Sequence, residues 1–196
     1  MAILVDKEEK RKAIALSCAE LLLEKGINSL TISQIAETAG VGKGTMYEYF
    51  KNKDDIVFEI IILFINEYTA KLQNIISSQK STKEQVFDFL FLIHAKENIG
   101  YLKIYLEFIA ISLQNGTDDM VNFSIEYKSR FILRLRKIIQ HGIENGEIKP
   151  EALGLEKAWI TFSLGLIVET KTINLTPAED IKKALDIWFK LIEVNK

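Results

Sequence analysis

Apolar side chains recur along the chain at the three- and four-residue spacing that places them on one face of a helix. In the first such segment Ile14, Cys18 and Leu22 share a face, and Gly26 ends the pattern. Short breaks separate the segments, and none reads as a credible strand. The pattern predicts an all-α chain of about nine helices. They are expected at residues 7–25, 32–39, 43–50, 53–77, 83–96, 99–115, 118–145, 152–172 and 178–194.

Three helix starts carry recognisable capping residues. Thr31 and Gln34 have the spacing of a capping box, in which each side chain satisfies a backbone N–H of the first turn. Asn52 is placed to cap the helix that follows it, with two aspartates in the positive first turn. Thr176 and Pro177 combine an N-cap with a proline at the first helical position.

The helices expected at 32–39 and 43–50 are separated only by Gly40, Val41 and Gly42. Two short helices joined by a glycine-containing turn are the helix-turn-helix pattern. Met46 and Phe50 lie four residues apart and are expected to point inward. Gly44 would let the backbone approach DNA, and the outward side chains suit a helix in the major groove. These are Lys43, Thr45, Tyr47, Glu48 and Tyr49.

Residues 31–53 read TISQIAETAGVGKGTMYEYFKNK. This gap-free run closely resembles the TetR/AcrR signature, roughly T-x-x-x-I-A-x-x-A-G-V-S-x-G-T-L-Y-x-Y-F-x-S-K. The resemblance implies a three-helix DNA-binding domain at 1–53 and a helical ligand-binding and dimerisation domain at 54–196. It also implies a repressor that binds a pseudo-palindromic operator in double-stranded DNA as a homodimer and is released by a small-molecule effector. The aromatic residues of the larger domain suggest that this effector is hydrophobic.

The resemblance assigns roles at the matching positions. Lys43 would read base edges, and Lys53, at a helix N-terminus, would hold a phosphate. Gly44 would permit close approach to DNA. The remaining expected contacts to bases or phosphates are Thr31, Ser33, Thr45, Tyr47 and Tyr49.

The motif departs from the family pattern at two positions, and some of its residues have structural alternatives. Gly42 replaces the usual serine and so removes a capping hydroxyl, while Met46 replaces leucine in the core. The tyrosines could pack rather than contact DNA. Asn52 and Lys53 could be only a cap and a solvated charge.

Aromatic residues of the larger domain suit either a pocket for a lipophilic molecule or an ordinary core. Segment 99–113 is apolar around the helix except at Lys103 and Glu107, which are expected to pair on an exposed strip. The histidine of the set has a plain alternative, a hydrogen-bonded core residue. The candidate ligand contacts are Tyr68, His94, Tyr101, Tyr105 and Phe108.

The last two helices each carry a broad apolar face with aromatic residues. Gly154, Ala158 and Gly165 would permit close helix approach. Such faces can be intramolecular core or a dimer interface, and the TetR resemblance favours a four-helix bundle formed by two subunits. The candidate interface residues are Trp159, Phe162, Leu166, Leu185, Trp188 and Phe189.

The composition indicates a folded chain, and the charge limits how the chain could bind DNA. A chain with 48% hydrophobic and 27% charged residues can fold around a core. Its net charge is −2, but residues 1–53 carry eight Lys/Arg against seven Asp/Glu, so DNA binding must depend on local placement of charge. The single cysteine, Cys18, is expected to be a buried free thiol.

The sequence gives little support to an enzyme. The Glu-x-x-His pairs of di-iron bundles are absent, two histidines and one cysteine make no metal set, and no phosphate-binding or nucleophile motif occurs. We expect no catalysis, cofactor or metal. With no signal peptide and no stretch long enough to span a membrane, a soluble cytoplasmic protein is expected. The rival hypothesis is a helical ligand-binding or protein-interaction module without sequence-specific DNA binding.

Overall fold

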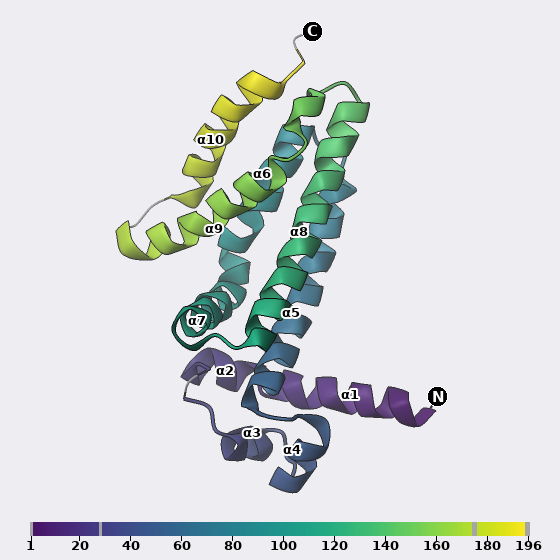
Figure 1. Ribbon diagram of the computed structural model, residues 1–196, viewed down its shortest axis with the longest axis vertical. Helices are drawn as coiled ribbons and strands as arrows, with labels where there is room; N and C mark the ends of the chain where they lie inside the picture. Colours follow the sequence, from purple (N-terminus) through teal and green to yellow (C-terminus); the bar gives the residue numbers. More distant parts are fainter. Residues whose placement is uncertain (1, 28, 174–175, 195–196) are drawn as a thin grey trace. The chain divides into compact units, whose positions relative to one another are not determined.

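The computed structural model describes residues 2–27, 29–173 and 176–194. Across these ranges the regular structure is helical, which confirms the predicted all-α class, and an isolated bridge pairs Ile148 with Glu193. Figure 1 shows the helices along the chain. They are α1 (Ala2–Ser17), α2 (Ala19–Lys25), α3 (Ile32–Thr38), α4 (Lys43–Tyr49), α5 (Lys53–Ile76), α6 (Thr82–Phe91), α7 (Ile99–Asn115), α8 (Asp118–Glu144), α9 (Glu156–Ile173) and α10 (Pro177–Ile192), with short 3-10 turns at Leu92–His94, Lys96–Asn98 and Pro150–Ala152.

The chain forms two compact units. Unit 1 comprises Met1–Thr69 and Lys103–Gln114, and unit 2 comprises Ala70–Leu102 and Asn115–Lys196. Helices α5 and α7 therefore contribute residues to both units. The functional boundary expected between residues 53 and 54 stays a prediction.

The single helix expected over 7–25 is divided into α1 and α2 at Cys18. The Ser17 hydroxyl donates to the carbonyl of Ile14 at 2.8 Å, and the N–H of Cys18 bonds the carbonyl of Ala15 at 3.1 Å instead. A serine that bonds the backbone of its own helix competes with the regular ladder in this way. The Cys18 side chain is fully buried, which confirms the expected buried thiol, and burial raises its pKa.

Arg11 connects three helices of unit 1. Its guanidinium donates to both carboxylate oxygens of Asp55, at 2.6 and 3.3 Å, and to Glu59 at 2.8 Å, both on α5. It also donates to the carbonyl of Tyr49, the last residue of α4, and lies 4.3 Å from the centre of the Phe50 ring. Burial alone would raise the pKa of Asp55, but the hydrogen bonds from Arg11 and from the N–H of Lys51 outweigh it and lower the pKa.

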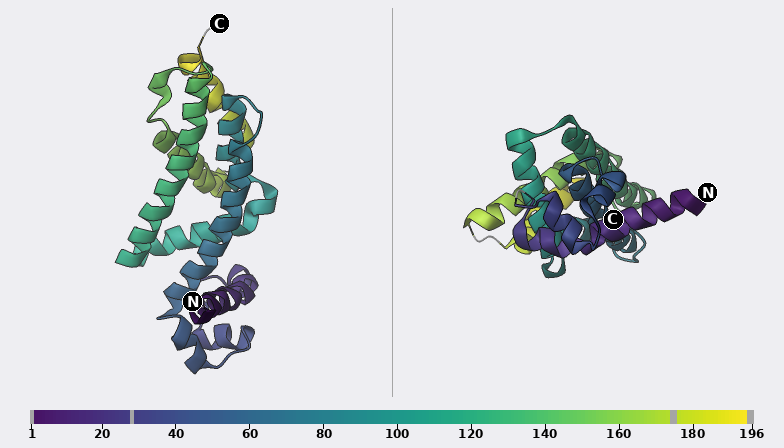
Figure 2. Two further views of the ribbon diagram at one scale, coloured as in Figure 1. Left: turned by 90° about the vertical axis from the view of Figure 1, so that its right-hand side faces the viewer. Right: turned by 90° about the horizontal axis from the view of Figure 1, so that it is seen from below.

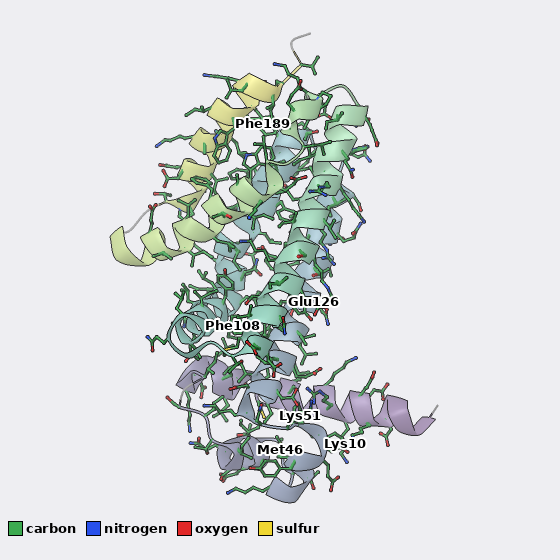
Figure 3. All side chains as sticks on the ribbon, viewed as in Figure 1. Lys10, Met46, Lys51, Phe108, Glu126 and Phe189 are labelled. Atoms are coloured by element: carbon green, nitrogen blue, oxygen red, sulfur yellow. The ribbon has the colours of Figure 1, made fainter. Side chains whose placement is uncertain are left out.

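Unit 2 is built from α8, α9 and α10 packed around α6, and α6 and α8 run side by side (Figure 1, Figure 2). Trp159 of α9 is 1% exposed and stacks on Phe189 of α10, with ring centres 5.9 Å apart. Figure 3 labels Phe189 on α10. Gly142 of α8 lies so close to Thr82 of α6 that a methyl group at this position would clash with it. The absence of a side chain at this position therefore lets two helices approach closely.

The helix expected over 83–96 ends earlier than predicted, at Phe91. The buried Asn98 side chain donates to the carbonyl of Leu92 at 2.6 Å, and the Ser163 hydroxyl donates to the carbonyl of Leu90 at 2.6 Å. These carbonyls thus bond side chains from elsewhere in unit 2, and the chain continues in 3-10 turns. The start of α6 carries a capping box of Ser81 and Glu84 that the sequence reading missed.

The helix expected from residue 152 begins only at Glu156. Gly154 adopts a φ of 101°, a conformation that favours glycine and does not continue a helix. Glu156 is 1% exposed and accepts a bond from Nε of Arg136 on α8 at 2.8 Å. At the start of α10, Pro177 is the first helical residue as predicted, but the Thr176 side chain makes no capping bond.

The Asp55 ion pair gives a pH-dependent prediction. Replacing Asp55 by Asn should lower the free energy of unfolding at pH 7 by about 2 kcal/mol, because Arg11 loses a charged acceptor. The folded-state pKa of Asp55 is below the unfolded value of about 3.9, so this contribution is complete above about pH 4 and is lost as the pH falls through the folded-state pKa. Chemical denaturation at pH 7, 4 and 3 measures it.

Asp54→Asn is the matched control, because Asp54 lies in the same first turn of α5 and does not accept the Arg11 bonds described above. The stability difference between the parent and Asp55→Asn should shrink towards pH 3. A difference that stayed constant over this range would contradict the proposed contribution of the ion pair.

Candidate DNA-binding interface

Helix α3 begins with the predicted capping box. The N–H of Gln34 donates to the Thr31 hydroxyl at 3.3 Å, and the N–H of Thr31 donates to the Gln34 side chain at 3.0 Å. Ile35 and Ala36 on the inner side of α3 are buried. The Thr31 hydroxyl is thus committed to the helix start, while Ser33 is exposed on the outer side.

The turn between α3 and α4 requires its first glycine. Gly40 has a φ of 66°, and the N–H of Val41 bonds the carbonyl of Ala36 at 2.9 Å, which closes the end of α3. Gly42 is the N-cap of α4 and contributes no side-chain bond, although its carbonyl accepts from the N–H of Met46. Backbone hydrogen bonds thus mark both the end of α3 and the start of α4.

Helix α4 has a buried inner side and an open outer side. Met46 is 1% exposed and Phe50, directly after the helix, is 2% exposed, as predicted; Figure 3 labels Met46 among the helices of unit 1. Lys43 is exposed, and Tyr47 keeps 61% of its surface exposed. A methyl group added to Gly44 would meet open space. The outer side of α4 is thus exposed at Lys43, Gly44 and Tyr47.

The other expected DNA contacts are half-buried. Thr45 and Tyr49 lie at the margin of the outer side, and the Lys7 ammonium of α1 lies 6.0 Å from the centre of the Tyr49 ring. At the start of α5, Asn52 caps the helix by accepting from the N–H of Asp55 at 2.8 Å, as predicted. Lys53 donates to the carbonyl of Ile27 at 3.1 Å, so its ammonium has a defined position.

Arg11 and Glu107 are two residues of this unit whose roles the sequence reading missed. Arg11 lies three residues before Ile14 on the apolar face of α1. A positively charged residue on an otherwise apolar face could have indicated a partly buried ion pair. Glu107 was expected to pair with Lys103 on an exposed strip. Instead its carboxylate accepts from the backbone N–H of Ile27 at 2.6 Å, a contact that helix periodicity could not reveal.

The candidate ligand residues divide between the units. In unit 1, burial raises the pKa of Tyr68 and Tyr105, and Phe108 is 4% exposed with its ring edge-on to Phe58. Figure 3 labels Phe108 on α7. In unit 2, the Lys71 ammonium lies 5.4 Å from the centre of the Tyr101 ring. These side chains contribute to packing within the chain, and their contact with a ligand stays a prediction.

His94 has the bonds expected of a core histidine. Its Nε2 lies 3.0 Å from the carbonyl of Ser163 and 3.3 Å from the hydroxyl, and the ring stacks on Phe91. Burial lowers the pKa of His94, and the bond to Ser163 only partly offsets this effect. His94 and Phe91 also line an open groove of unit 2, together with Pro177.

The candidate dimer residues are largely enclosed by their own chain. Trp159, Leu166, Leu185 and Phe189 are each at most 4% exposed. Phe162 and Trp188 are half-buried and pack edge-to-face, with ring centres 5.1 Å apart. These aromatic side chains fill the contact between α9 and α10 of one chain. The outward faces of the same helices carry other residues: Ala158, Thr161, Gly165 and Val168 on α9, and Ile187 and Leu191 on α10.

The described part of the chain contains no gathering of three or more His, Cys, Asp or Glu side chains that could hold a metal ion. Within the same ranges, no helix combines the length and the apolar character that crossing a bilayer requires.

Comparison with known proteins identifies the motif and the fold. Residues 17–60 match the family of bacterial regulatory proteins of the tetR type. The HTH-type transcriptional regulator SrpR of Pseudomonas putida is 23% identical over 195 residues, which cover 95% of this chain and 87% of SrpR.

Solved structures have the same fold over nearly the whole chain. A TetR-family transcriptional regulator from Cytophaga hutchinsonii has a TM-score of 0.80 at 17% identity, covering 97% of this chain and 98% of that one. A transcriptional regulator from Saccharomonospora viridis, solved in complex with choline, has a TM-score of 0.75 at 16% identity, covering 96% and 100%. The family match falls on the helix-turn-helix and the shared fold extends beyond it, so the chain has the DNA-binding motif and the fold of TetR-family transcriptional regulators.

Proposed function

We propose that the chain is a repressor that binds a pseudo-palindromic operator as a homodimer and leaves it when a small hydrophobic molecule binds. The observation that carries this proposal is helix α4, whose apolar residues Met46 and Phe50 are buried while Lys43 and Tyr47 stay exposed. A helix anchored on one side and polar on the other is what major-groove recognition requires.

The residues of unit 1 suggest a division of labour on DNA. Lys43, exposed at the start of α4, reads base edges, and Tyr47 and Thr45 contact bases or phosphates beside it. Lys53 holds a phosphate together with the N-terminus of α5. Exposed lysines of α1 and the α4–α5 turn, including Lys10 and Lys51 labelled in Figure 3, add positive charge to this unit. Local charge of this kind supports DNA binding by a chain whose net charge is −2.

A homodimer is supported by the outward faces of α9 and α10. One short recognition helix reads few bases, and a two-fold axis doubles the site. Gly165 meets open space at its Cβ position, so a partner helix could approach closely there. On α10, Ile187 and Leu191 are 62% and 69% exposed one turn apart. We assign the interface to these residues in place of the enclosed aromatic side chains.

A small-molecule effector is supported by the aromatic residues of α5 and α7 and by the choline bound in one structural neighbour. Tyr68 and Tyr105 are aromatic rings with a polar tip, and burial raises the pKa of both; rings of this kind suit a lipophilic ligand. The effector lowers operator affinity only if it binds the DNA-incompetent state more tightly than the DNA-bound state. We further propose that the protein acts in the cytoplasm and without catalysis, and a module that binds no specific DNA is the alternative.

The first functional prediction separates base reading from phosphate binding. Lys43→Ala should cost about 1–3 kcal/mol and relax base preference at one position of each half-site. Lys53→Ala should weaken binding to all sequences alike and lower the salt slope by about 0.9. Fluorescence anisotropy with an operator selected from random duplexes and with a scrambled duplex measures both. Equal affinity of the parent protein for the two duplexes would favour the alternative function.

The second functional prediction concerns assembly. Ile187→Glu should convert the dimer to monomer in analytical ultracentrifugation at micromolar concentration, because it places a charge in the proposed apolar interface. Gln140→Glu makes the same change in charge at an exposed position of α8 and should leave the dimer intact. A monomeric parent protein, or a dimeric Ile187→Glu variant, would refute the assignment.

The third functional prediction concerns the effector. Among a panel of lipophilic and cationic compounds, at least one should weaken operator binding by the parent protein. The response should be lost in Tyr105→Ala but kept in Leu113→Ala, an exposed control position on the same helix. If no compound acts, effector release is wrong; if Tyr105→Ala responds like the parent, the assignment of Tyr105 is wrong.

A further inference from the structure

The turn between α2 and α3 is held by two charged side chains that come from other helices. The backbone N–H of Ile27 donates to Oε1 of Glu107 on α7 at 2.6 Å. The carbonyl of the same residue accepts from Nζ of Lys53 at 3.1 Å. Ile27 itself is 2% exposed, so its side chain fixes this piece of backbone in the core. Both polar groups of one buried residue are thus bound by ionised groups.

The residue before this turn is shaped to admit the carboxylate. Gly26 ends α2 with a φ of 77°, a conformation that favours glycine. The Glu107 carboxylate occupies the space that a Cβ atom at this position would take. A residue with a side chain would therefore meet both an unfavourable backbone conformation and the carboxylate. Both the backbone conformation of Gly26 and its lack of a side chain are thus consistent with a turn built around the Glu107 carboxylate.

Lys53 can bind Ile27 and DNA at the same time. An ammonium group has three N–H donors, and one of them reaches the Ile27 carbonyl. The others remain available to a phosphate at the N-terminus of α5. The carbonyl therefore restricts a flexible lysine side chain to one position, which lowers the entropy lost when the phosphate binds.

We infer that Glu107 is a positioning residue for operator binding, which acts through the backbone of Ile27 on the ammonium group of Lys53. The inference rests on the proposed role of Lys53 at a phosphate. Glu107 belongs to α7, far from the helix-turn-helix in sequence, and its carboxylate adds negative charge to a DNA-binding unit. The negative charge of Glu107 opposes DNA binding, so its favourable contribution must come from the position that it gives to the turn.

The experiment compares Glu107→Ala with Glu107→Gln in the full-length protein. Both variants remove the same charge, but only glutamine retains an oxygen that can accept from the Ile27 N–H. Operator affinity is measured against salt concentration with the selected and the scrambled duplex. Glu107→Ala should bind both about tenfold more weakly, the effect of one charge-assisted hydrogen bond, with a salt slope reduced towards that of Lys53→Ala. Glu107→Gln should recover most of the parent affinity and slope.

The double variant Glu107→Ala/Lys53→Ala tests the route. It should bind no more weakly than Lys53→Ala alone, because the effect of Glu107 passes through Lys53. The inference is overturned by additive losses, by a parental slope in Glu107→Ala, or by equal impairment of the alanine and glutamine variants. If Glu107→Ala does not fold, Glu107→Asp replaces it, since it keeps the charge and withdraws the acceptor by one methylene.

The outcome is separable from the proposed function. A parent protein that does not distinguish the two duplexes contradicts the repressor proposal itself. A parent protein that distinguishes them, with a Lys53→Ala variant of unchanged slope, leaves the repressor proposal standing but contradicts the role of Lys53 at a phosphate, and with it the link from Glu107.

Discussion

The bonds of Arg11 are the constraint on which the recognition helix depends. A helix of seven residues such as α4 is not stable alone, so its conformation and direction must come from its neighbours. Arg11 binds the carbonyl of Tyr49, where α4 ends, and the carboxylates of Asp55 and Glu59, where α5 begins. Its guanidinium also covers the ring of Phe50, the buried residue between the two helices. One planar cation thereby connects α1, the end of α4 and the start of α5.

The same arrangement explains how an acidic chain can serve a nucleic-acid function. The carboxylates of Asp55 and Glu59 are both bound by Arg11, whose positive charge partly offsets their negative charge within the unit. The exposed lysines, in contrast, include Lys43 on the outer side of α4 and Lys51 in the following turn. Net charge is a property of the whole chain, whereas a duplex responds to the charges within about a Debye length of its phosphates. The placement of a few lysines therefore outweighs a small negative total.

The helix-turn-helix could be predicted from sequence because its signals are local. The capping box of Thr31, the left-handed Gly40 and the cap at Asn52 each act within five residues. The breaks at Phe91 and before Glu156 were not predicted. The break at Phe91 accompanies bonds from Asn98 and Ser163, which only the fold brings to it.

The apolar faces of α9 and α10 show a second limit of periodicity. The spacing placed Trp159 and Phe189 on apolar helix faces, for which both a core and a dimer interface were considered, because a helical face looks the same in sequence whether its own chain or a second chain covers it. Here the two rings stack on each other within one chain. The residues on the outward faces of these helices, such as Gly165 and Ile187, do not stand out in the sequence. They could be identified as exposed only after the structure showed that the aromatic residues are buried.

Arg11 and Glu107 solve the same problem at opposite ends of the helix-turn-helix. A carbonyl in the last turn of a helix and an N–H in a turn between helices both have no partner within a helix, so each needs a donor or an acceptor from elsewhere. After α2 the N–H of Ile27 is bound by Glu107, and at the end of α4 the carbonyl of Tyr49 is bound by Arg11. In both cases the partner is an ionised side chain on a distant helix. The position of the DNA-reading segment therefore depends on α1, α5 and α7 as well as on its own short helices.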